Sequence, residues 1–352
     1  MKIQDITENT FWQLLTIYII LIIAIALGFL SRFALYFNIF ALIISIFGIS
    51  ILSKEEKSEM KTWKKLHIIL FILSIIFIIL FRTIPYIGND IPLGYDAGLY
   101  KYGIEYGLQN KDQWILSGME PGFLYLTKPL SFIFSTDVLL KHIFILFIIL
   151  LGFAIYVFSK EYFDSNTAIL ALLVYSLSLV QFEIFTYLYY KNIIALSLIL
   201  FSFYFLKKEK YLLFVLTGIL IGSIHRPSFY IFGLSYLFFA FTSPYKEQKY
   251  NFNNLKRNIL SGIIILIGSS LFYIGDFKQA VLSMISPVLS SFIQTGESPG
   301  TFITFNVYQF SILFYLPFAF LGLFFLIKNK KFDILFFYTL ILAVIVYFKF
   351  FF

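Results

Sequence analysis

The sequence predicts an all-α, polytopic integral membrane protein. Of its 352 residues, 60% are hydrophobic and only 13% are charged, whereas a soluble domain carries about 25% charged residues. A water-soluble core cannot hide this much Phe, Ile and Leu, so the solvent around most of the chain is expected to be lipid. The sequence lacks the strict alternation typical of an outer-membrane barrel. It also lacks cysteine, which excludes disulfides and thiolate metal sites.

The basic net charge of +8 has two explanations. It suits a nucleic-acid-binding protein, or a membrane protein whose cytoplasmic loops are rich in Lys and Arg. The apolar composition favours the second, so no nucleic-acid partner is expected. The first apolar segment, 11–30, is too long for a signal peptide and lacks a small-residue cleavage site, so it is predicted to be a retained span.

About eleven stretches approach the roughly 20 apolar residues that a transmembrane helix needs. They are 11–30, 33–53, 66–82, 138–158, 167–186, 188–206, 211–224, 228–242, 258–275, 308–327 and 333–350. The short pair 211–224 and 228–242 meets at Pro227 and is predicted to form a tight hairpin. No internal repeat divides the chain, so 1–352 is interpreted as a single membrane domain.

Basic connections between the spans predict their orientation. Four of them are rich in Lys or Arg, namely 54–65, 207–210, 245–257 and 328–331. Such connections stay in the cytoplasm, and all four can do so if 121–135, broken by Lys128 and Pro129, does not cross. That segment is predicted to be an interfacial or re-entrant helix inside a large external loop, 83–137, after the third span. The N-terminus is then cytoplasmic, in a multi-pass protein of the cell membrane.

The external loop contains the first candidate site, "GYDAGLYKYGIEY". If it is helical from Tyr95, Asp96 and Tyr100 stand one turn apart on one face. Asp96 could be a general base for an acceptor hydroxyl, or a ligand of a divalent cation with help from Asp90 or Glu120. No cofactor is required by the sequence, and this divalent metal is the one candidate. Tyr100 and its aromatic neighbours are expected to stack on sugar rings.

A second candidate, "MEPGFLYLTKPL", follows in the same loop. Glu120 precedes Pro121, which fits the first position of a helix. A helix start is the structural interpretation of this motif. The aromatic surface that follows would suit a lipid tail or a sugar face.

Two further external turns carry cations. Lys191 lies at the outer end of a span, where it could reach lipid headgroups or neutralise a phosphate. Glu183, about two turns earlier, is its candidate partner, because acids at membrane depth are usually paired. Arg226 offers a planar fork for phosphate, and His225 could bind the same anion or move a proton. Contact with lipid headgroups is the alternative for this pair.

The four candidates combine into one chemical hypothesis. Lys191, His225 and Arg226 would hold a lipid-linked phosphate or diphosphate, and Asp96 would activate the attacking hydroxyl. No Walker loop, dinucleotide fingerprint or catalytic-triad signature is present. The energy is therefore expected to come from an activated substrate or a gradient rather than from bound ATP.

The order of these motifs resembles that of the EpsG/Wzy-like polysaccharide polymerases and, more loosely, of GT-C glycosyltransferases. The resemblance covers roughly 66–242, through "FRTIPYIGND…GYDAGLY", "EPGFLYL", "YYKNIIALSLILFSFYFLKKEK" and "HRPSFYIF". The chain departs from the polymerase pattern in having Lys191-Asn192 for Arg-Gln and Tyr95 for Thr. The resemblance implies the site positions Asp96, Tyr100, Glu120, Gly122, Lys191, Asn192 and His225.

The function expected from this resemblance is transfer or polymerisation of sugars in cell-surface polysaccharide (exopolysaccharide or O-antigen) biosynthesis. The substrate would be a polyprenyl-linked sugar or oligosaccharide, used at the outer face of the cytoplasmic membrane, with the bilayer and other polysaccharide-assembly proteins as partners. A GT-C-type transferase of a single sugar from a polyprenyl-phosphate donor is one alternative. A glycan transporter or flippase, or a non-catalytic envelope assembly protein, is another.

Overall fold

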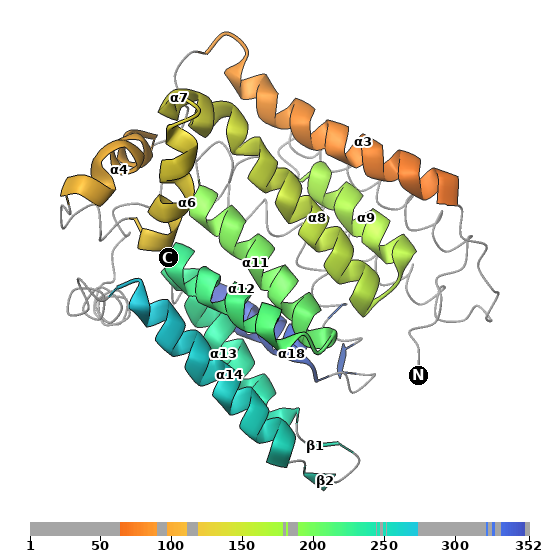
Figure 1. Ribbon diagram of the computed structural model, residues 1–352. Helices are drawn as coiled ribbons and strands as arrows, with labels where there is room; N and C mark the ends of the chain where they lie inside the picture. The colour runs from red at the N-terminus through yellow and green to blue at the C-terminus, as the bar shows by residue number, and fades with distance from the viewer. Residues whose placement is uncertain are drawn as a thin grey trace.

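The fold is helical throughout, apart from one short hairpin, in the part of the chain that the computed structural model describes (Figure 1). That part comprises 64–89, 97–110, 119–178, 181, 189–243, 245–246, 249–250, 252–273, 322, 326–327 and 332–348. The hairpin pairs β1 (Tyr245–Lys246) with β2 (Lys249–Tyr250) in antiparallel register. The predicted spans 11–30 and 33–53, most of 308–327, and the residues Asp90, Asp96 and Glu183 lie outside the described residues.

Within the described residues, three helices are long and apolar enough to cross a membrane, judged by length and composition. They lie at Lys65–Tyr86, Thr136–Tyr162 and Tyr190–Lys207, matching the predicted spans 66–82, 138–158 and 188–206. Their main elements are α3 (Lys64–Thr83), α8 (Ile145–Tyr162) and α11 (Tyr190–Lys207). On α3, the isoleucines and leucines remain largely exposed, as expected of a face whose solvent is lipid.

The other long helices are α9 (Ser165–Ser176), α12 (Tyr211–Ile224), α13 (Arg226–Thr242), α14 (Phe252–Leu271) and α18 (Ile334–Phe348). Among them, α9 packs on α8, α12 packs on α11, α14 packs on α12 and α13, and α18 packs on α13. In Figure 1, α8, α11, α12 and α14 slant in one general direction, and α3 runs beside α8 and α9. The predicted hairpin at Pro227 is confirmed, because a single residue, His225, joins α12 to α13.

The helix ends divide into two groups, which we call the basic end and the site end. The basic end holds the turns after α8, α11 and α13, with Lys160, Lys208, Lys210 and Arg257 in or beside them. The site end holds the ends of α3, α9, α12 and α14 and the starts of α11 and α13. Contacts at this end join Arg82 to Ser176 and Tyr273 to Gly222.

The short helices at the site end come from the predicted loop 83–137 and from the start of the predicted span 138–158. They are η1 (Ile84–Tyr86), α4 (Ala97–Asn110), α6 (Pro121–Ser131), α7 (Thr136–Val138) and the π-helical turn η2 (Leu139–Ile143). At 11 residues, α6 is only about 16 Å long, too short to span a bilayer of about 30 Å. The helix α6 is thus too short to cross by itself, and the placement of 121–135 in an external loop stays a prediction.

The predicted span 167–186 does not form one continuous helix, and its residues 179–180 and 182–186 lie outside the described residues. The helix α9 ends at Ser176, where the backbone of Leu177 leaves helical geometry. The Arg82 side chain donates to the carbonyl oxygen of Ser176 at 3.2 Å, and a cation at a helix C-terminus stabilises the end of the helix. Hydropathy alone did not show this stop, because the apolar run continues past it.

Candidate functional site

The site begins at Glu120, directly before α6. Its backbone is extended (φ −72°, ψ 141°), and Pro121 occupies the first turn of the helix, where a missing N–H costs nothing. The Glu120 side chain makes no capping bond to its own helix. It points instead to other helices and is 3% exposed. A buried carboxylate needs partners of opposite charge, and these come from α11 and α13.

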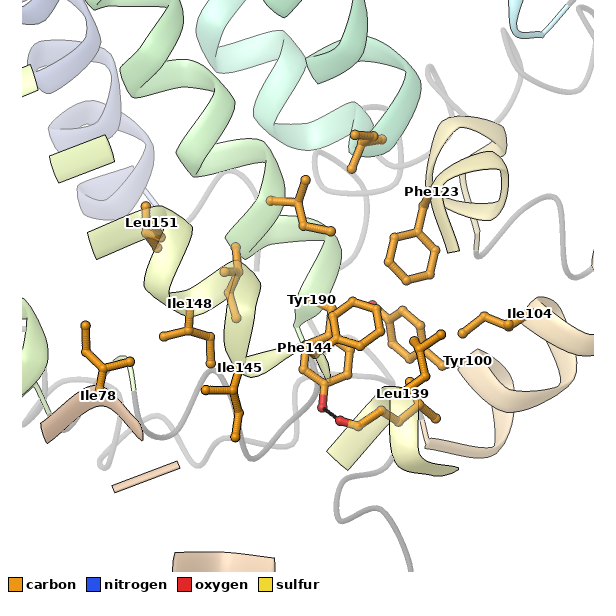
Figure 2. Packing of buried hydrophobic residues seen from close by; sticks show 14 of the residues in the cluster. Ile78, Tyr100, Ile104, Phe123, Leu139, Phe144, Ile145, Ile148, Leu151 and Tyr190 are labelled. Carbon is orange, nitrogen blue, oxygen red and sulfur yellow. Dashed lines mark hydrogen bonds between the residues drawn. The ribbon is translucent and has the colours of Figure 1, made fainter. Parts of the chain in front are cut away.

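The first partner is Lys191, in the first turn of α11. Its Nζ donates to Oε2 of Glu120 at 2.8 Å. The preceding residue, Tyr190, fixes this start of α11, because its ring stacks on Phe144 with centroids 4.1 Å apart and its hydroxyl donates to the carbonyl oxygen of Leu140 (Figure 2). The position of Lys191 is thus fixed, because Tyr190, the first residue of α11, is packed in the core.

The second partner is the turn between α12 and α13. The backbone N–H of Arg226 donates to Oε1 of Glu120 at 3.2 Å, and Nε of the same arginine lies 3.6 Å from that oxygen. Arg226 is the first residue of α13, so the carboxylate also faces the positive end of a helix dipole. The starts of α6, α11 and α13 therefore converge on one buried negative charge.

Close packing of α6 on α12 makes this convergence possible. A Cβ added at Gly122 would lie 2.3 Å from Oγ and 2.7 Å from the backbone oxygen of Ser223. Only glycine allows the first turn of α6 to come so near. Gly122, implied by the resemblance as a site position, is thus explained by packing.

His225 caps α13 and takes part in the same cluster. Its Nδ1 accepts from the backbone N–H of Ser228 at 3.3 Å and lies 2.7 Å from the Ser228 hydroxyl. Burial, assisted by the Lys191 and Arg226 cations against the opposing effect of Glu120, lowers the pKa of His225 to about 4. The imidazole is therefore neutral at pH 7, and because Nδ1 accepts, its proton is assigned to Nε2.

Glu120 itself stays ionised. Burial alone would raise its pKa, but the charges of Lys191, His225 and Arg226 and the hydrogen bond from Lys191 outweigh burial and hold the pKa at about 2. Among the described residues, the cluster thus combines an ionised carboxylate with the Lys191 and Arg226 cations at pH 7.

Tyrosines line one side of the cluster. The Arg226 guanidinium carbon lies 6.0 Å from the ring centroid of Tyr273, whose hydroxyl donates to the Gly222 carbonyl oxygen at 2.9 Å. The buried hydroxyl of Tyr230 has no hydrogen-bond partner among the described residues. A buried hydroxyl without a partner is uncommon and marks a place where a polar ligand atom would fit.

Four of the residues predicted from the sequence, Glu120, Lys191, His225 and Arg226, therefore meet in one cluster. Asn192 follows Lys191 on α11 and is half-buried. Glu120 is a carboxylate that binds Lys191. The predicted pairing of Lys191 with Glu183 stays a prediction, because Glu183 lies outside the described residues.

The expectation that Tyr100 stacks on a sugar ring stays a prediction. Tyr100 is 2% exposed, and its ring makes edge contacts with Phe123 and Tyr190 (Figure 2). These contacts place the tyrosine in the core that joins α4 and α6 to α11. Its role is to hold these helices together.

The metal hypothesis gains no support from the residues placed here. Within the described ranges, no group of three His, Asp or Glu side chains is arranged to hold a metal ion. Glu120, named as a possible helper, is already bound to two cationic groups. The principal candidate ligands, Asp96 and Asp90, lie outside the described residues.

Sequence reasoning gave no site role to Arg82 or Tyr273. Arg82 is 1% exposed near the end of α3, and its Nε and Nη2 lack hydrogen-bond partners in the described part of the chain. An arginine closing an apolar span was a usable signal. Tyr273 is one of 25 tyrosines and carried no signal of its own.

Comparisons with known proteins do not identify a family or a function for this chain. No protein-family model matches this chain, and searches of curated proteins and of solved structures find no match.

Proposed function

We propose that this protein is a membrane glycosyltransferase or polysaccharide polymerase that uses polyprenyl-phosphate- or diphosphate-linked sugars. The observation that carries the proposal is that Lys191 and Arg226, at the starts of α11 and α13, meet around the buried carboxylate of Glu120. An ammonium and a guanidinium held close together are groups that bind phosphate. A lipid-linked phosphate is therefore the proposed ligand.

The cluster supports a division of labour for such a transfer. Lys191 and Arg226 bind the phosphate and stabilise the charge that develops on it as the sugar departs. His225, with its proton on Nε2, donates a hydrogen bond without adding charge. Asp96 is the proposed base for the acceptor hydroxyl; it directly precedes α4, which packs on α6.

The location of the cluster favours an enzyme over a transporter. Transporters usually bind their substrate near the middle of the membrane, between broken helices. Here the charged groups gather at helix starts, at the end of the bundle away from the lysine-rich turns. If those turns are cytoplasmic, the cluster faces the outer leaflet, where lipid-linked sugars await assembly.

Analysis of glycans and lipid-linked intermediates in a deletion strain tests the function. Accumulated single repeat units would identify a polymerase, and a glycan lacking one sugar would identify a single-sugar transferase. Complementation with Lys191→Met should fail, whereas Lys208→Met should succeed, since Lys208 pairs with Glu161 at the basic end. Unchanged glycans in the deletion strain would overturn the proposal.

A further inference from the structure

One tyrosine at the site end buries its hydroxyl without a hydrogen bond to any described residue. Tyr230, in the second turn of α13, is only partly buried as a residue, but its hydroxyl oxygen is fully buried. The phenol therefore points into the molecule, with the hydroxyl at its inner end. A hydroxyl that loses its bonds to water is costly to bury unless another group bonds to it.

Tyr230 lies on the same face of α13 as Arg226. The two residues are four positions apart, so their side chains are neighbours, one turn apart, on the helix surface. Because long side chains on a helix lean toward its N-terminus, the phenol is directed back toward the turn that holds Arg226. The charges of Arg226 and Glu120 both act on this phenol. The hydroxyl thus belongs to the cluster of Glu120, Lys191 and Arg226.

Tyr273 provides a contrast at the same place. Its hydroxyl donates to the Gly222 carbonyl oxygen at 2.9 Å, and its ring centroid lies 6.0 Å from the Arg226 guanidinium carbon. It also interacts electrostatically with Tyr230. Of the two tyrosines beside Arg226, Tyr273 uses its hydroxyl to bind another helix, whereas Tyr230 keeps a donor for a group from outside.

A phosphate oxygen is the acceptor that fits this donor. Arg226 and Lys191 are side chains that bind phosphate oxygens, and a phosphate group has further oxygens that remain after such contacts. One of them is within reach of a hydroxyl that lies one helical turn from Arg226. A hydrogen bond from a neutral hydroxyl to an anionic oxygen is also stronger than one to a neutral oxygen.

We propose that the Tyr230 hydroxyl donates a hydrogen bond to the phosphate that Lys191 and Arg226 bind, which makes Tyr230 a third binding residue. This inference rests on the proposed function, because it takes the cluster to be the phosphate site. The ligand chemistry is a phosphate anion, carried by a lipid or free in solution. Since the hydroxyl gains its bond only when the ligand is present, it contributes to affinity and not to folding.

Binding of two probes to the full chain in a maltoside detergent tests the inference. The probes are farnesyl ethyl phosphate, a lipid phosphodiester, and inorganic phosphate. Tyr230→Phe should weaken binding of the phosphodiester by about tenfold, because a bond to a charged oxygen is lost. A loss for this probe alone assigns the site to a lipid-linked phosphate, and a loss for both probes assigns it to phosphate in general.

The melting temperature without ligand is the second measurement. Tyr230→Phe keeps the ring and removes an atom with no partner among the described residues, so it should melt at the same or a higher temperature than the wild type.

Tyr236→Phe is the matched control on the same helix. The Tyr236 hydroxyl donates to the Asn258 carbonyl oxygen at 3.0 Å. This variant should therefore melt at a lower temperature than the wild type and bind both probes with unchanged affinity. The two substitutions remove the same atom and have opposite expected effects.

The outcomes separate this inference from the proposed function. If Lys191→Met weakens binding of farnesyl ethyl phosphate and Tyr230→Phe does not, the role of Tyr230 is overturned while the phosphate site stands. A Tyr230→Phe variant that keeps its affinity but melts at a lower temperature overturns it too, because the hydroxyl then has a structural partner. If the wild type binds neither probe, the phosphate site of the proposed function is overturned as well.

Discussion

Glu120 and Lys191, 71 positions apart in the sequence, form an ion pair of 2.8 Å around a carboxylate that is only 3% exposed. A buried pair of this kind contributes little net stability, but breaking it leaves a charge without a partner. The pair therefore gives the most direct measure of whether the cluster forms as described. If Lys191 is replaced, Arg226 still compensates part of the Glu120 charge.

Removing Lys191 should be more damaging than removing both members of the pair. We expect Lys191→Met to destabilise the protein by about 2–4 kcal/mol, because Glu120 stays buried with a weaker partner. The double variant Glu120→Gln/Lys191→Met should lose less than the sum of the single variants, with a coupling of about 1 kcal/mol or more. Reversible unfolding in detergent, analysed as a double-mutant cycle, measures this. Additive losses would show that the two groups do not interact.

Acid should destabilise the protein in two stages. The pKa of His225 falls from 6.5 to about 4 on folding, so below pH 6.5 the unfolded chain binds the proton more readily and stability falls until about pH 4. The pKa of Glu120 falls from 4.5 to about 2, so its contribution is complete above pH 4.5 and disappears as the pH approaches 2. Melting temperature against pH measures both stages.

His225→Asn is the matched control for the first stage. Asparagine can still accept the Ser228 N–H at the start of α13, but it does not titrate. The melting temperature of the variant should no longer fall between pH 6.5 and 4. It should still fall below pH 4.5, where Glu120 takes up a proton. An unchanged profile would mean that another group causes the first stage.

Gly122 should tolerate no side chain. We expect Gly122→Ala to cost about 2 kcal/mol or more, because its Cβ would lie 2.3 Å from Ser223 Oγ. Ser223→Gly should rescue it only in part, since the Ser223 backbone oxygen remains 2.7 Å away. Gly233→Ala is the control, because nothing lies within 4 Å of its added Cβ; it should be neutral or stabilising by about 0.5–1 kcal/mol. Equal effects of both substitutions would contradict the packing of α6 on α12.

Arg82 should contribute little to stability for so buried a residue. One nitrogen donates to the Ser176 carbonyl, while Nε and Nη2 have no partner among the described residues. We therefore expect Arg82→Met to change the free energy of unfolding by no more than about 1 kcal/mol, because it removes unsatisfied groups together with one bond. A loss as large as that of Lys191→Met, measured in the same assay, would show that Arg82 has a strong charged partner.

Most of the helices could be predicted from the sequence, whereas the contacts within the site could not. Apolar length is enough to find α3, α8 and α11, because each needs only to match the bilayer. The contact of Lys191 with Glu120 could not be predicted, because the two residues are far apart in the sequence and the contact depends on how Gly122 fits against Ser223. Local patterns do not show such a fit between distant segments.

Burial was hard to predict for a related reason. In a soluble protein an apolar residue is expected inside, but in lipid both the core and the outer face of a helix are apolar. The ring of Tyr100 and the exposed isoleucines of α3 therefore look alike in the sequence, although they have opposite environments. Charged residues were the better guide, since an ionised group far from water must find a partner.

The one-residue connection between α12 and α13 has a consequence for how the chain can vary in length. An inserted residue beside His225 would turn the start of α13 by about 100° and take Arg226 away from Glu120. The connection from α11 to α12 comprises three residues, Lys208–Lys210, and the longer one from α13 to α14 includes the small hairpin. Insertions and deletions should therefore be tolerated at the lysine-rich turns and rejected where α12 reverses into α13.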